Sequence, residues 1–357
     1  MTRIARLESR HECVPLARPY AIAGHRIDQA EIFFLELEDE RGRHGFGSAS
    51  PAPEVTGETP AACAEALAPE RLEWLIGADS RRLGTLCRRA GEAMAATPAA
   101  RAAVEIALHD LLARELAVPL VDLLGRCHDA LPTSLTIGIL DTDETLAVAA
   151  EALSLGFHCL KVKLGGEAEA DATRLARLRE RVGPDVAIRV DANCGYEPGD
   201  LAALDACATA LNLELVEQPL ARGAEVHLRE LPETSRRRLV LDESVRDERD
   251  ALALAAPRPT AGVFNLKLMK CGGLTPARAI ADIAGTAGVA LMWGCNDESA
   301  ASIAAALHLA YACPATRFLD LDGSFNLAHD RIAGGFVVED GRMRLVEAPG
   351  LGTEKAA

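Results

Sequence analysis

The chain has 357 residues, of which 49% are apolar and only 4% aromatic. This length exceeds what one hydrophobic core usually supports, so we expect a large domain and a smaller one. The formal net charge of −15 opposes binding to nucleic acid or to an anionic membrane surface, and no apolar run approaches membrane-spanning length.

The first part of the chain predicts an α+β domain. Two alternating runs, RIARLESRHECVPL (residues 3–16) and AEIFFLELEDERGRHGFGSAS (residues 30–50), are typical of strands, and the second turns at DERG. Residues 80–116 show helical periodicity, as in AARAAVEIALHDLLARELAV. The segment PLVDLLG follows, in which Gly125 is a helix stop signal.

From about residue 132, short apolar runs alternate with amphipathic helical segments. Polar residues near the ends of these runs recur at intervals of 25 to 28 residues: Lys163, Asp191, Glu217, Asp242, Lys267, Cys295 and Asp320. A βα unit repeated about eight times predicts a closed parallel barrel. The alternative is a doubly wound open sheet, which would favour a glycine-rich nucleotide turn, and no G-x-G-x-x-G follows a strand here.

Three acidic residues, Asp191, Glu217 and Asp242, end consecutive strands of this pattern. Active sites of parallel barrels lie at the carboxyl ends of the strands. Carboxylates gathered there repel each other and are costly to desolvate unless a cation holds them. One such residue means little in a chain with 53 acidic residues, but three in succession predict a site for one Mg²⁺, which prefers oxygen ligands.

Three lysines flank this predicted metal site. In the run HCLKVKLGG, alternation places Lys161 and Lys163 on one face of the second strand, and Lys267 lies on the sixth strand, across the mouth of a closed barrel. Each lysine alone is compatible with an ordinary surface position. Together they favour removal of a proton α to a carboxylate, because a metal ion stabilises the enediolate charge that develops.

A lysine that acts as a base must be neutral, and neighbouring positive charge lowers its pKa. We therefore expect Lys161 to tune Lys163 and to contact the substrate carboxylate. With Lys163 and Lys267 on opposite faces, one lysine takes the proton and the other returns one. This arrangement predicts 1,1-proton transfer, which is racemisation or epimerisation.

Five motifs, KVK, DAN, EQP, DES and KLMKCGG, resemble those of the enolase superfamily, in its muconate-lactonising subgroup. The resemblance covers nearly the whole chain. It implies an α/β fold with an N-terminal α+β capping domain (residues 1–125), a (β/α)7β TIM-like barrel (residues 126–325) and a C-terminal segment (residues 326–357) that returns to the cap. The subgroup includes cycloisomerases, o-succinylbenzoate synthases, N-acylamino acid racemases and dipeptide epimerases.

The eighth strand ends in LDLDGS, which places Asp320 and Asp322 on one face. In this subgroup the pair resembles that of dipeptide epimerases, where it binds the free α-ammonium group. Such a pair would repel the dianions muconate and succinylbenzoate. The resemblance therefore implies a Mg²⁺-dependent dipeptide epimerase, in which Lys163 and Lys267 invert the α-carbon of the C-terminal residue and Thr136 touches the substrate.

Alternatives from the same subgroup are an o-succinylbenzoate synthase or cycloisomerase-type lyase and an N-acylamino acid racemase. A different class is a non-catalytic barrel that binds a small molecule. Both catalytic lysines and all three acids are present, which disfavours this last reading.

The cap segment at residues 18–29 is expected to close over the substrate. Relatives that act on Ala-Glu carry an arginine here, where this chain has Gly24, with Arg26 two residues later. After the seventh strand, GCNDES places Asp297 and Glu298 at the mouth, where an acid pairs with a cationic side chain or caps the following helix. We therefore expect a non-acidic dipeptide, and favour a cationic one.

Ten cysteines are scattered along the sequence without a C-x-x-C pair, which is typical of a reduced protein. The first ten residues, MTRIARLESR, contain no apolar signal segment. We expect a cytoplasmic enzyme that forms a homo-oligomer and binds a small dipeptide, with no nucleic-acid or membrane partner.

Overall fold

The structure, a computed structural model, describes residues 2–22, 25–165 and 167–356. Its N-terminal part is an antiparallel sheet in the order β1-β2-β3, whose strands are β1 (Ile4–Ile22), β2 (His25–Asp39) and β3 (His44–Ala49). The turn predicted at DERG joins β2 to β3, and the Asp39 carboxylate accepts the backbone N–H groups of Arg41 and Arg43 there. The strand predictions are confirmed. Strand β1 ends later, and strand β2 begins earlier, than the sequence pattern indicated.

In the described part of the chain, six α-helices complete this cap: α1 (Pro53–Thr56), α2 (Pro60–Ala66), α3 (Pro69–Leu72), α4 (Leu83–Ala93), α5 (Pro98–Leu116) and α6 (Leu120–Leu124). The periodic stretch at residues 80–116 forms two of them, because Pro98 begins a new helix. Helix α5 lies directly on β3: a Cβ atom at Gly47 would be 2.0 Å from the Ala103 carbonyl oxygen. Glycine therefore permits the close contact between helix and strand. Gly125 caps α6 in the left-handed conformation, as predicted.

The second part is an eight-stranded parallel sheet in the order β12-β11-β10-β9-β8-β7-β6-β5. Its strands are β5 (Leu135–Ile137), β6 (Cys159–Lys163), β7 (Ala187–Asp191), β8 (Leu215–Glu217), β9 (Leu239–Leu241), β10 (Val263–Leu266), β11 (Ala290–Gly294) and β12 (Thr316–Asp320). A parallel bridge between Thr133 and Leu319 brings the first and last strands together, so the sheet nearly closes. The TIM-like barrel is confirmed, and the open doubly wound sheet is excluded.

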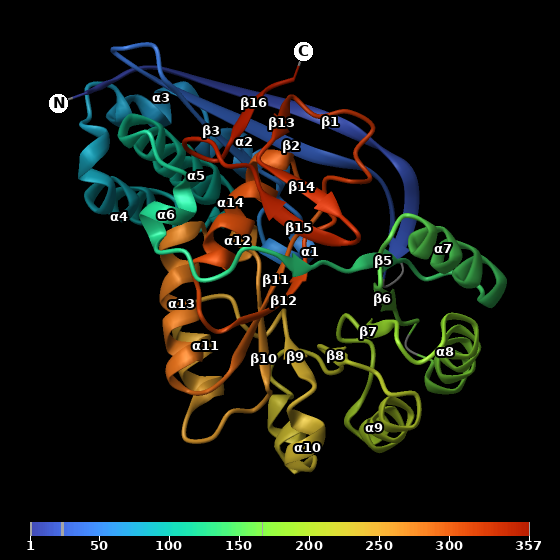
Figure 1. Ribbon diagram of the computed structural model, residues 1–357. Helices are drawn as coiled ribbons and strands as arrows, with labels where there is room; N and C mark the ends of the chain where they lie inside the picture. Colours follow the sequence, from blue (N-terminus) through green and yellow to red (C-terminus); the bar gives the residue numbers. More distant parts are fainter. Residues whose placement is uncertain (1, 23–24, 166, 357) are drawn as a thin grey trace.

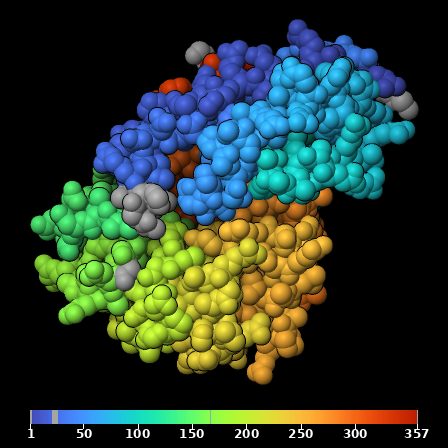
Figure 2. Space-filling view, turned by 180° about the vertical axis from the view of Figure 1, so that it is seen from behind, coloured from blue at the N-terminus to red at the C-terminus, as the bar shows by residue number. Residues whose placement is uncertain are grey.

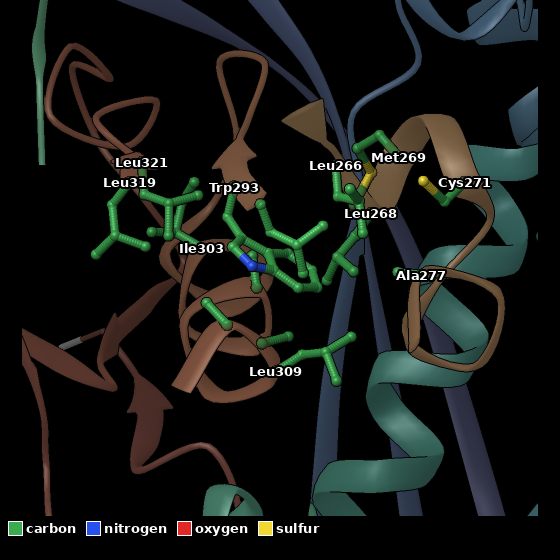
Figure 3. Packing of buried hydrophobic residues seen from close by; sticks show 14 of the residues in the cluster. Leu266, Leu268, Met269, Cys271, Ala277, Trp293, Ile303, Leu309, Leu319 and Leu321 are labelled. Carbon is green, nitrogen blue, oxygen red and sulfur yellow. The ribbon is translucent and has the colours of Figure 1, made fainter. Parts of the chain in front are cut away.

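The helices of the barrel are α7 (Thr142–Ser154), α8 (Ala168–Val182), α9 (Leu201–Ala210), α10 (Glu233–Arg236), α11 (Glu248–Ala255), α12 (Leu268–Cys271), α13 (Leu274–Thr286) and α14 (Ala300–Tyr311). They surround the strands, as Figure 1 shows. The fully buried Trp293 of β11 lies among apolar side chains that include Ile303 of α14 (Figure 3). Its indole N–H donates to the Thr316 hydroxyl at 2.9 Å, which satisfies its one polar atom.

The C-terminal strands are β13 (Ile332–Gly334), β14 (Phe336–Glu339), β15 (Arg342–Leu345) and β16 (Thr353–Lys355), and β15 also pairs with β4 (Leu131–Pro132). The last strand contacts the cap: the Lys355 ammonium lies 2.8 Å from the Glu36 carboxylate, and the Arg114 guanidinium donates to the Thr353 carbonyl at 2.6 Å. The cap lies across one end of the barrel (Figure 2). Within the described ranges, no helix is both long and apolar enough to cross a bilayer.

Candidate active site

Register between parallel strands brings the predicted polar residues into one layer at the barrel mouth. Lys163 of β6 lies beside Asp191 of β7, which lies beside Glu217 of β8. Asp242 follows β9 directly. The three carboxylates are at most 2% exposed, so the structure places all three predicted metal ligands together in a buried region at the carboxyl ends of consecutive strands.

Lys161 contacts two of these three carboxylates and also Asp320. Its ammonium nitrogen is 2.8 Å from Glu217, 3.1 Å from Asp191 and 2.7 Å from Asp320. Lys163 is two residues later on the same strand, and its ammonium donates to Asp191 Oδ2 at 2.7 Å. The predicted alternation along β6 is confirmed, because Val162, between the two lysines, packs in the apolar core.

Lys267 occupies the other side of the mouth, because β6 and β10 are four strands apart in the order of the barrel. Its ammonium lies 2.9 Å from Asp242 Oδ2, whose other carboxylate oxygen accepts from Lys270 at 2.5 Å. Lys270 also donates to the Asn265 carbonyl at 3.0 Å and is 4% exposed. Lys270 is therefore a buried structural contact that fixes the Asp242 carboxylate.

Neighbouring carboxylates determine the direction of the pKa shifts of Lys267 and Lys161. Burial lowers the pKa of Lys267, but Asp242 raises it, and the net direction is upward. Lys161 also lowers the pKa of Lys267, but the carboxylates outweigh it. The pKa of Lys161 itself lies well above its usual value, because Asp191, Asp320 and Glu217 outweigh the effect of burial.

The donor set suits a hard divalent cation. Burial raises the pKa of Glu217, and the neighbouring Asp191 raises it further, which is the signature of carboxylates that lack enough positive charge. Asn265 donates to Glu217 Oε1 at 2.7 Å and orients it. Oxygen ligands of this kind match Mg²⁺, so the residues fit the predicted ion.

Lysines contact all three carboxylates: Lys161 lies against Asp191 and Glu217, and Lys267 lies against Asp242. Elsewhere in the described chain, three potential metal-ligating atoms within 4.8 Å of each other occur on the exposed side chains of His11 and Cys13 with the half-buried Glu31. There an ion pair of 2.5 Å between His11 and Glu31 accounts for the proximity.

The predicted ammonium-binding pair lies where the barrel closes. Asp320 Oδ1 accepts from the Ser134 hydroxyl at 2.5 Å, and its other oxygen accepts from Lys161 at 2.7 Å. Asp322 Oδ2 accepts the backbone N–H of Thr136 at 2.7 Å. Burial and the neighbouring Asp320 raise the pKa of Asp322 to about 6. Thr136 thus contacts Asp322, and its contact with substrate stays a prediction.

Two residues of the site were not singled out from the sequence. Ser134 comes two positions before Thr136 in the SLTIGIL run, and Asn193 ends the DAN motif. The Asn193 side chain accepts from Lys163 at 3.1 Å. Short polar side chains near a strand end are common, so the sequence alone did not indicate a role for either residue. Ser134 becomes recognisable only once the barrel closes, and Asn193 only once the position of Lys163 is known.

The cap segment at residues 18–29 forms the ends of β1 and β2, with strand structure on both sides of residues 23–24. Arg26 lies on β2 with its side chain exposed, and no hydrogen bond or ion pair joins it to the described part of the site. Gly24 lies outside the described residues. Tyr20, which the sequence reasoning missed, donates its hydroxyl to Asp297 Oδ2 at 2.8 Å.

The two acids after β11 have different environments. Glu298 is 2% exposed and accepts the backbone N–H of Asn296 at 2.8 Å, and the N-terminal cap of α14 is Ser299. Asp297 is half-buried, and burial raises its pKa to about 6. Lys163 is close enough to lower that pKa. Asp297 therefore lies at the mouth without serving as the helix cap.

Comparison with known families matches most of the chain. Residues 5–125 match the family described as mandelate racemase / muconate lactonizing enzyme, N-terminal domain. Residues 144–356 match the family described as enolase C-terminal domain-like.

Close relatives match this chain along nearly its whole length. An L-Lys-D/L-Arg epimerase of Methylococcus capsulatus is 54% identical, covering 98% of this chain and 98% of the relative. An L-Lys-D/L-Arg epimerase of Desulforapulum autotrophicum is 48% identical, covering 96% and 97%. A crystal structure of the dipeptide epimerase from Methylococcus capsulatus, complexed with Mg and the dipeptide L-Arg-D-Lys, has a TM-score of 0.97 at 54% identity and covers 98% of this chain and 99% of that one.

Proposed function

Because the chain belongs to the mandelate racemase / muconate lactonizing enzyme family of the enolase superfamily, we propose that it is a Mg²⁺-dependent dipeptide epimerase. The reaction is 1,1-proton transfer at the α-carbon of the C-terminal residue. One observation carries the proposal: Lys163 and Lys267 extend from strands on opposite sides of the barrel, with three buried carboxylates between them.

Asp191, Glu217 and Asp242 would hold one Mg²⁺ per subunit. When bound, this ion supplies positive charge that stabilises negative charge developing on the substrate carboxylate. Lys161 would provide a further positive charge to that carboxylate. Its contacts with Asp191 and Glu217 keep it beside the proposed ligands.

The lysines divide the proton transfer. A substrate α-carbon placed across the mouth faces Lys163 on one side and Lys267 on the other. One neutral lysine accepts the α-proton at Nζ, and the ammonium on the opposite side donates a proton to the other face. The configuration at the α-carbon is then inverted.

Asp320 and Asp322 would bind the free α-ammonium group of the dipeptide. Both carboxylates are positioned by contacts with Ser134 and Thr136 near the start of the barrel. An ammonium ion between two carboxylates forms charge-assisted hydrogen bonds. N-acylamino acids and the dianionic substrates of the related lyases carry no cation for this position, so a free dipeptide is the better match.

For the side chains we propose a cationic dipeptide. The support is the half-buried Asp297 at the mouth and the likeness to relatives named L-Lys-D/L-Arg epimerase. We further propose a cytoplasmic enzyme without nucleic-acid or membrane partners, supported by ten free cysteines and the acidic net charge. The homo-oligomer stays a prediction.

The test is incubation of the enzyme with a dipeptide library and Mg²⁺ in D₂O. Mass spectrometry should find dipeptides that gain one mass unit through exchange of the α-proton, and the same samples with a chelator serve as the control. The strongest signals are expected for dipeptides of lysine and arginine. Exchange of no dipeptide in the presence of Mg²⁺ would refute the proposed function.

A further inference from the structure

We propose that Tyr20 is a positioning residue that holds the Asp297 carboxylate at the barrel mouth, where Asp297 binds the cationic side chain of the dipeptide. This inference rests on the proposed function and deepens it. In this inference, the Asp297 carboxylate selects a positively charged substrate side chain, and the Tyr20 hydroxyl orients that carboxylate.

The cap holds the loop that carries Asp297 at two points. The Tyr20 hydroxyl, near the end of β1, donates to Asp297 Oδ2 at 2.8 Å. The Ser50 hydroxyl, just after β3, donates to the Asp297 carbonyl oxygen at 2.6 Å. Asn296 donates its side-chain amide back to the Ser50 carbonyl at 3.3 Å. Side chain and main chain of this loop are therefore fixed from two separate cap segments.

The hydrogen bond from Tyr20 occupies only one of the two carboxylate oxygens. Among the described residues, no protein group donates a hydrogen bond to Asp297 Oδ1. The carboxylate is half-buried, so it is partly desolvated and still reachable from the mouth. A carboxylate with a free oxygen in such a position suits an ammonium or guanidinium group, which offers several N–H donors.

Charged groups of the proposed site lie near this pair. The Lys163 ammonium is close enough to lower the pKa of Asp297, and Asp322 is close enough to contribute to raising the pKa of Tyr20. The pair is thus near both the proposed proton-transfer lysine and the proposed site for the α-ammonium group. Asp320 and Asp322, positioned by Ser134 and Thr136, are assigned to the α-ammonium group, which leaves Asp297 for a second cation of the substrate.

The test compares a dipeptide of lysine and arginine with a neutral dipeptide in two variants. Asp297→Asn should lower kcat/KM for the cationic dipeptide roughly 100-fold, because a buried charge loses its partner. Tyr20→Phe keeps the ring and should lower it roughly fivefold through KM, with kcat unchanged, because one neutral-to-charged hydrogen bond is lost. Both variants should lower kcat/KM for the neutral dipeptide less than for the cationic one, so the ratio between the two substrates falls.

Tyr311→Phe is the matched control, since it removes another buried tyrosine hydroxyl, which donates to the Met343 carbonyl at 2.6 Å. It should alter both substrates equally. If Tyr20→Phe also alters both equally, or if Asp297→Asn leaves the ratio between the two substrates unchanged, the inference is overturned. Failure of the proposed function looks different, because the wild-type enzyme would then exchange neither dipeptide.

Discussion

Replacement of Asp320 by asparagine tests how the enzyme recognises a dipeptide. Asparagine keeps the shape of the side chain and removes its charge. Asp320 is 4% exposed and is held by the Ser134 hydroxyl at 2.5 Å and the Lys161 ammonium at 2.7 Å. We expect a large loss of activity, since the amide cannot serve as an anionic partner for the α-ammonium group.

The magnitude follows from the burial of Asp320. Removing one partner of a buried charge pair costs about 2–5 kcal/mol. Because 1.36 kcal/mol corresponds to a factor of ten, kcat/KM should fall roughly 30-fold to several thousand-fold. Ser134→Ala is the matched control: it removes a neutral donor to the same carboxylate and should cost roughly ten-fold or less, since the charge remains.

The assay measures kcat/KM for a free dipeptide and for the same dipeptide acetylated at its N-terminus. Asp320→Asn should reduce activity on the free dipeptide far more than on the acetylated one, which has no ammonium group to lose. Equal losses on both substrates would refute the reasoning. They would show that Asp320 acts through Lys161 and not through the substrate.

Two further predictions concern the lysines and a buried histidine. Lys163→Ala and Lys267→Ala should each abolish epimerisation, while each variant still exchanges the α-proton of one diastereomer, because the other lysine remains; mass spectrometry of the L,L and L,D dipeptides in D₂O checks this. Burial lowers the pKa of His308 to about 4, and its Nδ1 atom accepts the Val121 N–H at 3.0 Å. Between pH 6.5 and 4 the unfolded chain therefore binds a proton at His308 that the folded chain does not. The contribution of the neutral His308 to the free energy of unfolding is complete above pH 6.5 and declines as the pH falls. The loss at pH 5 is about 2 kcal/mol, from an ordinary histidine pKa of about 6.5. His308→Asn should make the unfolding free energy less dependent on pH in this window; an unchanged slope would contradict the argument.

The layer of polar residues at the barrel mouth could be predicted because it depends on local rules. The repeating βα unit places the carboxyl ends of the strands at the same edge of the barrel. Asp191, Glu217 and Asp242 therefore come together at that edge, regardless of the sequence of the helices between the strands. Alternation along one strand likewise determines the face of Lys161 and Lys163. These features need no knowledge of distant contacts.

The contacts of the cap could not be predicted in this way. Tyr20 meets Asp297 across 277 residues of sequence, and Ser50 meets the same residue across 247. No periodicity relates a strand of the cap to a loop of the barrel. The direction of the pKa shifts of Lys161 and Lys267 also depends on which carboxylates each ammonium contacts, and spacing along the sequence does not show those contacts.

The label in the product of a single dipeptide tests the central claim most directly. L-Lys-L-Arg is incubated with the enzyme and Mg²⁺ in D₂O, and the L-Lys-D-Arg formed early in the reaction is isolated. Transfer between two lysines on opposite faces predicts one deuterium at its α-carbon, because the lysine that donates has exchanged with solvent. Formation of L-Lys-D-Arg that retains the original α-proton, or of no epimer from any dipeptide, would contradict the account.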